Sequence, residues 1–143
     1  MVEIAGSNIR KPYVAGTFYP EAADALRTAV TGYLDGAAPG DPSAAVPKAI
    51  IAPHAGYVYS GAVAASAYNR LVPGAKTITR VVLAGPSHRV PFRGIAVPSV
   101  DTFESPLGPV AIDREAVGKI AGLPFVVEMD EAHAMEHSLE VHI

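Results

Sequence analysis

Apolar residues along the chain follow two patterns, a helical spacing and short continuous runs, which predict different elements. Between residues 21 and 34 they recur every three or four positions, which predicts an amphipathic helix. Residues 48–53 (KAIIAP) and 79–85 (TRVVLAG) are continuous apolar runs, which predict short strands buried on both faces. An alanine-rich helix predicted over 60–71 separates them. This β–α–β order is typical of a parallel sheet covered by helices.

The rest of the chain continues the alternation of short apolar runs and helical patterns. The predicted elements are strands at 94–98, 110–112 and 124–127 and helices at 113–121 and 131–143. Residues 1–9 are expected to form a loose terminus. We therefore predict an α/β fold in a single domain over residues 1–143, a mostly parallel sheet with helices on both faces.

Composition supports a globular protein and excludes several partners. Half of the 143 residues are apolar and 17% are charged, as in ordinary folded domains. The net charge is −3 and the basic residues are scattered, which argues against nucleic acid. The absence of cysteine removes disulfides and thiolate ligands from this stretch. Residues 49–69 lack charges but contain Pro53 and His54, so we expect no membrane span, and without a leader peptide a cytoplasmic location.

Two histidines follow the two predicted buried strands at matching positions. His54 comes directly after residues 48–53, and His88 lies three residues after 79–85. Neighbouring parallel strands, about 5 Å apart, end at the same edge of a sheet, where α/β folds bind ligands. Imidazole suits iron, zinc or copper, so the pair predicts a shared metal site, although at least one more ligand is needed. The alternative is two loop histidines bonded to backbone groups.

Polar and aromatic residues close to these histidines are expected to rim the pocket. They are Tyr57, Ser60, Ser87 and Arg89. Each of them alone fits a surface or packing role better than a role in the pocket. Ser87 in GPSHR also sits where a nucleophile elbow places its serine, but Arg89 stands where that motif has its second glycine, so serine catalysis is the weaker interpretation.

The C-terminal pattern EAHAMEHSLEVHI offers further candidates. His133, Glu136 and His137 match H-x-x-E-H, in which two histidines on one helix face bind zinc and the glutamate activates water. A zinc peptidase is therefore one alternative. The other is a polar helix face beside a pocket.

Five segments together carry a resemblance to a known family. They are VAGTFYP at 14–20, APHAGYVYSG at 52–61, GPSHR at 85–89, SPLGPV at 105–110 and EHSLEVHI at 136–143. In these segments the sequence resembles the Memo family, also called AmmeMemoRadiSam system protein B. The resemblance implies a three-layer fold similar to LigB-like class III extradiol dioxygenases, and in prokaryotes an association with a radical-SAM system.

The resemblance also implies roles for individual residues. His54 and His88 fall on the family's metal-ligand histidines, and Glu136 and His137 fall on a motif expected at the catalytic pocket. Iron is the favoured divalent metal, with copper and zinc as alternatives. Further strands are expected to follow Ile143 with the third ligand, so the fold should be incomplete at the C-terminus.

Two classes of function remain open at this point. One is a dioxygenase-like, metal-dependent oxidoreductase acting on a small molecule. The other is a non-catalytic protein that binds a metal ion or a protein partner in a vestigial pocket. We also expect Leu139, Val141 and Ile143 to be exposed and to promote association, such as a homo-oligomer.

Overall fold

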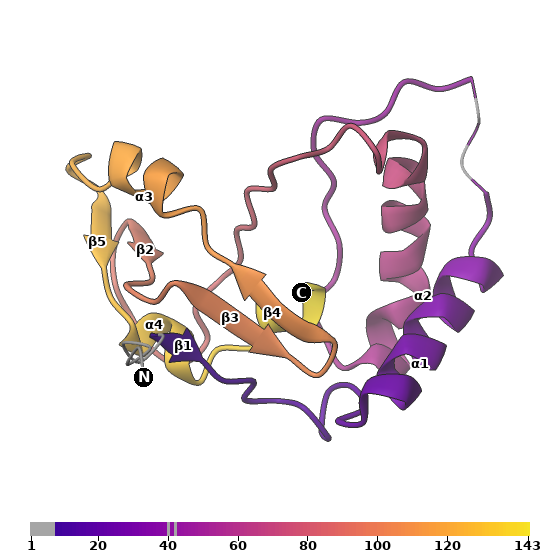
Figure 1. Cartoon of the computed structure of the whole chain (residues 1–143), viewed down its shortest axis with the longest axis horizontal. Helices are drawn as coiled ribbons and strands as arrows, with labels where there is room; N and C mark the ends of the chain where they lie inside the picture. The colour runs from indigo at the N-terminus through magenta and orange to yellow at the C-terminus, as the bar shows by residue number, and fades with distance from the viewer. Residues whose placement is uncertain (1–7, 40, 42) are drawn as a thin grey trace, which may run out of the picture.

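A computed structural model describes residues 8–39, 41 and 43–143 of the chain, and over these residues the fold is α/β (Figure 1). The helices are α1 (Ala23–Gly36), α2 (Tyr57–Tyr68), α3 (Arg114–Ile120) and α4 (Glu131–Ala134), with short 3₁₀ helices η1 (Asn69–Gly74) and η2 (Glu140–His142). The strands are β1 (Ile9–Arg10), β2 (Ile95–Val97), β3 (Thr102–Ser105), β4 (Gly108–Ala111) and β5 (Val126–Glu128).

The described strands form two small sheets. In the first, β3 lies between β1, to which it is parallel, and β4, to which it is antiparallel. In the second, β2 and β5 are parallel. Gly94 immediately precedes β2 and has a φ of 99°, and a Cβ there would stand 2.2 Å from the carbonyl oxygen of Phe125, so only glycine fits this approach.

Helices α1 and α2 pack side by side, at the opposite end of the molecule from the β2–β5 sheet (Figure 1). The two helices approach closely at Gly61, where a Cβ would stand 2.7 Å from the ring of Tyr33. The hydrophobic core consists of Val14, Tyr19, Leu26 and Val141. Because Val141 belongs to η2, this core attaches the end of the chain to the helical pair.

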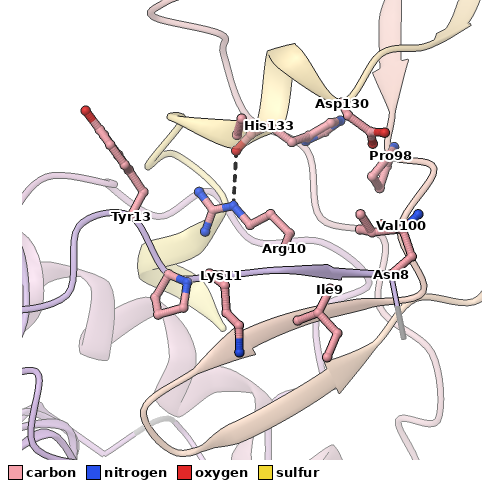
Figure 2. Close-up of a pocket in the computed structure, with 11 residues that line it drawn as sticks. Asn8, Ile9, Arg10, Lys11, Tyr13, Pro98, Val100, Asp130 and His133 are labelled. Carbon is pink, nitrogen blue, oxygen red and sulfur yellow. Dashed lines mark hydrogen bonds between the residues drawn. The ribbon is translucent and has the colours of Figure 1, made fainter. Parts of the chain in front are cut away.

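A buried ion pair connects β1 to the last segment of the chain. Arg10 pairs with Glu140 and also donates from Nη2 to the Glu136 carbonyl over 2.7 Å. Figure 2 shows its Nε donating to the carbonyl of His133, over 3.1 Å, beside a cavity of about 420 Å³. The Glu140 carboxylate in turn accepts a hydrogen bond of 2.6 Å from the hydroxyl of Tyr19. These contacts fix the path of residues 133–140, which carry part of the site described below.

Most of the predicted local elements are confirmed. Helices appear where the periodicity indicated them, as α1, as α2 followed by η1, and as α3. The short runs after residue 94 form β2, β4 and β5. Strands β1 and β3 were not predicted. Of the loose terminus expected over residues 1–9, Ile9 belongs to β1, and residues 1–7 lie outside the described residues.

The prediction of buried strands at 48–53 and 79–85 is wrong. Both segments are irregular, and Ile51 is 98% exposed and Val82 91% exposed. Among the described residues, no backbone–backbone hydrogen bond joins either segment to another part of the chain. An apolar run becomes a strand only where a neighbouring strand pairs with it. The described strands are all paired elsewhere.

The prediction of one helix from 131 to 143 is also wrong. Helix α4 ends at Ala134, and η2 begins at Glu140. Between them the Glu136 carboxylate accepts hydrogen bonds from the backbone N–H groups of His137 and Ser138. These side-chain bonds replace the backbone bonds that a continuous helix would form. The expected exposure of Val141 is wrong as well, since this side chain is 4% exposed in the core.

None of the described helices combines the length and the apolar character that crossing a membrane requires.

Candidate metal centre

Three imidazoles converge at one place in the structure. His54, His88 and His137 each offer a ring nitrogen, and these three atoms all lie within 4.8 Å of one another. The ring centroids are 5.2 Å apart for His54 and His88, 5.8 Å for His54 and His137, and 4.5 Å for His88 and His137. The three histidines could therefore hold one metal ion.

His54 is positioned by the loop that leads into α2. The Ser60 hydroxyl donates to the Ala55 carbonyl at 2.8 Å, and the Tyr57 N–H donates to the Phe18 carbonyl at 2.7 Å. These bonds hold the first turn of α2 against the segment before α1. The chain enters the helix through Gly56, where an added Cβ would stand 3.5 Å from the carbonyl oxygen of Phe18.

His88 is held by the carboxylate of Glu136. Its ring Nδ1 lies 2.8 Å from Glu136 Oε1, and its backbone N–H donates to Oε2. A carboxylate accepting from Nδ1 fixes the imidazole tautomer and leaves Nε2 with a free lone pair, as metal-binding histidines require. Glu136 is buried, whereas the His88 side chain is 40% exposed.

Glu136 also shapes the turn that presents His137. It accepts the backbone N–H groups of His137 and Ser138, each at 2.9 Å. The Ser138 hydroxyl donates to the Pro86 carbonyl at 2.7 Å, which connects this turn to the segment before His88. One carboxylate and one hydroxyl therefore set the relative position of two of the three imidazoles.

The protonation states suit metal binding. Burial by itself would raise the pKa of Glu136, but the N–H groups that it accepts outweigh burial and lower the pKa to about 2, so it is a carboxylate at neutral pH. Burial lowers the pKa of His137; the Glu136 carboxylate opposes this, and the neighbouring imidazoles of His88 and His54 lower the pKa further, so that the net shift is downward. Neutral imidazole is the form that binds iron, zinc or copper.

Comparison with known proteins decides the family. The sequence profile described as Memo-like protein matches residues 10–143. This chain belongs to the Memo-like family.

Several relatives of the Memo-like chain are similar over nearly all of its length. A MEMO1 family protein of Aquifex aeolicus (strain VF5) is 42% identical over 136 residues, covering 94% of this chain and 48% of the relative. The MEMO1 family protein MTH_45 of Methanothermobacter thermautotrophicus is 40% identical over 141 residues, covering 94% and 50%. Protein MEMO1 of Mus musculus is 35% identical over 130 residues, covering 90% and 42%. The chain spans about half the length of the curated relatives it matches.

The pocket residues expected from the sequence of this Memo-like chain are placed as follows. Tyr57 donates its hydroxyl to the Val141 carbonyl at 2.9 Å and packs against Tyr19, as part of the core edge. Ser60 is buried at the start of α2. Ser87 donates to the Val90 carbonyl at 2.8 Å within its own loop, and Arg89 is exposed next to His88.

The zinc-peptidase arrangement is not formed. His133 is buried in α4, where its ring meets Phe103 edge-on at 5.9 Å, and it is not one of the three clustered histidines. Because α4 ends at Ala134, His133 and His137 do not share a helix face. The matching letters H-x-x-E-H therefore lie across a helix end and a turn.

The third imidazole is that of His137, which we expected at the pocket as a catalytic residue and not as a ligand. The ligand expected beyond Ile143 stays a prediction. Sequence reasoning missed Phe18, whose ring lies 4.6 Å from that of His137 and forms a wall of the site. The only available signal for Phe18 was its place in the VAGTFYP segment, which the periodicity did not connect with the histidines.

Proposed function

We propose that this chain binds a divalent transition-metal ion through His54, His88 and His137, and that iron is the ion it takes in preference to copper or zinc. The observation that carries the proposal is the convergence of three ring nitrogens within 4.8 Å. Three imidazoles supply as many protein ligands as catalytic metal sites commonly use, and they leave coordination positions open.

The open positions favour an oxidoreductase that acts on a small molecule. With Fe(II) bound, such a site supplies the capacity to bind dioxygen and substrate together. The protein's part is to hold His88 in one tautomer through Glu136 and to shield one side of His137 with Phe18. The resemblance to the Memo family implies a LigB-like, dioxygenase-related fold, which supports this chemistry. The association with a radical-SAM system that the same resemblance implies in prokaryotes extends the proposal to a role beside that system.

Metal stoichiometry tests the binding proposal. The purified chain is loaded anaerobically with Fe(II), or with Zn(II) or Cu(II), dialysed, and assayed for bound metal. We expect about one ion per chain and loss of that ion in His54→Ala, His88→Ala and His137→Ala. His142→Ala is the matched control, since this half-buried histidine bonds to Tyr68 and lies outside the cluster. Equal metal content in the control and the three variants would refute the site.

Oxygen uptake separates the two functional classes. Iron-dependent uptake with a catechol-type substrate that is lost in His54→Ala would establish the enzyme. A tightly bound ion without uptake would support the second candidate, a non-catalytic metal-binding protein. That candidate is favoured by the structural roles of Tyr57 and Ser60, whose hydroxyl protons are donated to backbone carbonyls and so are not available to a substrate.

A further inference from the structure

A cavity of about 420 Å³ lies between β1, the loop from β2 to β3, and α4 (Figure 2). Its volume falls within the range of small-molecule sites, about 300–1,000 Å³. The apolar part of its lining comes from Ile9, Pro12, Pro98 and Val100. None of the three clustered histidines lines it, so this cavity is a ligand-sized space separate from the candidate metal centre.

Asp130 supplies a carboxylate to this cavity. Ser99 holds it, because the Ser99 hydroxyl donates to Oδ2 and the Ser99 N–H donates to Oδ1 over 2.8 Å. These bonds outweigh the effect of burial and lower the pKa of Asp130, so it is ionised at neutral pH. The guanidinium of Arg114 pairs with Asp101 and Glu128 instead. Among the described residues, the Asp130 carboxylate therefore has neutral hydrogen-bond donors but no ion-pair partner.

His133 adds an unused acceptor next to this carboxylate. The side chain is buried, and its Nε2 has no hydrogen-bond partner among the described residues. Burial lowers the pKa of His133 although the Ala96 carbonyl and nearby carboxylates oppose this, so the ring is neutral. A neutral ring that donates to a carbonyl from one nitrogen accepts with the other. Asp130 and His133 are three residues apart, and Figure 2 shows the His133 ring extending toward Asp130.

The cations that line the cavity are already paired. Arg10 forms its ion pair with Glu140, and its other two nitrogens donate to backbone carbonyls. The Nζ of Lys11 lies 2.7 Å from the Glu104 carboxylate. In the described part of the chain the cavity thus offers an uncompensated anion and a lone pair, but no free cation. This lining favours a ligand that carries positive charge and donates hydrogen bonds.

We propose that this cavity binds a primary ammonium ion carried on a short apolar chain, with the Asp130 carboxylate and His133 Nε2 as acceptors of its N–H groups. An ammonium has three donors, which suits a carboxylate oxygen together with an imidazole lone pair. The apolar chain of the ligand covers Ile9 and Val100, and removal of this surface from water adds to binding. The site needs no metal ion.

Titration of the metal-free 143-residue chain with n-hexylamine tests the proposal. The NMR amide signals of Ile9, Val100 and Ala134 should shift and saturate at about millimolar amine, the strength expected of so small a ligand, whereas those of α1 should not move. n-Hexanol and hexanoate have the same apolar chain without the positive charge, and should bind more than about ten-fold more weakly. No saturable shift at these amides, or equal binding of the three probes, would overturn the proposal.

Variants assign the binding to the two acceptors. Asp130→Asn removes the charge and can still accept from the Ser99 N–H, so the fold should persist, and hexylamine should bind more than about ten-fold more weakly. Glu131→Gln is the matched control, since it removes a neighbouring exposed charge of α4 outside the cavity lining and should leave binding unchanged. Equal losses in these two variants would mean that the amine follows overall charge, which contradicts the site.

The role of His133 is measured separately. His133→Phe keeps a ring against Phe103 but removes the lone pair, so it should weaken hexylamine binding and leave the weak binding of hexanol unchanged. In the unchanged chain, the ¹⁵N signal of His133 Nε2 should move as hexylamine saturates. An Nε2 signal that stays fixed would exclude His133 as an acceptor, and this readout holds even where the phenylalanine variant folds poorly.

Discussion

The guanidinium of Arg10 and the carboxylate of Glu140 form an ion pair across 130 positions of sequence, with side-chain exposures of 6% and 0%. Arg10 also donates to the carbonyls of His133 and Glu136, and Glu140 accepts the N–H groups of Tyr13 and Val14. The first described strand therefore determines where the turn carrying Glu136 and His137 lies.

Removal of one partner of this ion pair should destabilise the fold strongly. Arg10→Ala leaves a buried carboxylate without its cation, which costs about 3–5 kcal/mol in the free energy of unfolding. Urea denaturation monitored by circular dichroism measures the loss. The control is Lys119→Ala, which removes an exposed pair with Glu115 in α3 and should change stability by less than about 1 kcal/mol. Similar losses in both variants would show that the buried pair has no special role.

The same carboxylate predicts a pH dependence of stability. Burial would raise the pKa of Glu140, but hydrogen bonds from Tyr19, from two backbone N–H groups and from Arg10 outweigh it and lower the pKa. A lowered folded-state pKa means that the stabilisation is complete above the unfolded value of about 4.3 and is lost as the pH falls through the folded value.

Comparing the Glu140→Gln variant with the unchanged chain isolates the contribution of the Glu140 carboxylate to the pH dependence of stability. Stability measured between pH 7 and pH 3 should fall less steeply in Glu140→Gln than in the natural chain, because the variant lacks the titrating group. Parallel curves for the two proteins would contradict the assignment. The readout is the urea midpoint at each pH, taken without added metal.

Glu136→Gln should weaken metal binding while leaving the three imidazoles in place. The amide no longer offers a charged acceptor to the His88 ring, and loss of such a partner typically costs about 10–100-fold in metal affinity. Competition with a chromophoric chelator measures the dissociation constant. Glu131→Gln, an exposed glutamate of α4, should leave the affinity unchanged. Unfolding measured in parallel distinguishes lost affinity from lost structure.

Gly61→Ala should destabilise the packing of α1 on α2. A Cβ at this position would stand 2.7 Å from the Tyr33 ring, so the helices must separate at a cost of about 1–3 kcal/mol. Gly32→Ala in α1 is the matched control, because a Cβ there meets nothing within 4 Å. That control should stabilise the chain by up to about 1 kcal/mol, since alanine favours helix over glycine. Thermal melts of both variants provide the comparison.

The sequence predicted elements whose stability is local and missed those that depend on distant partners. The periodicity of α1 and the capping Asp113 of α3 act within a few residues, so these helices were visible in the pattern. Strand β1 has only two residues and exists because β3 pairs with it, which no local signal reveals. The apolar runs at 48–53 and 79–85 have strand composition, but composition supplies no hydrogen-bonding neighbour.

In the candidate metal site, too, the sequence predicted some features and missed those that depend on side-chain hydrogen bonds. Reasoning from strand ends pointed to His54 and His88 together, and their rings lie 5.2 Å apart although the segments before them are not paired strands. His137 was expected on a helix face, but it reaches the cluster from a turn built by side-chain hydrogen bonds. A turn made by Glu136 accepting its neighbours' N–H groups has no periodicity, so its geometry could not be read from the sequence.

The three clustered imidazoles come from stretches of chain that are far apart in sequence: the loop before α2, the loop before β2, and the turn after α4. An ion held by all three would act as a removable cross-link that closes two large loops at once. Each tenfold excess of free ion over the dissociation constant would then add about 1.4 kcal/mol to the free energy of unfolding. Chelation would reverse this gain, making the stability of the fold sensitive to the surrounding metal supply.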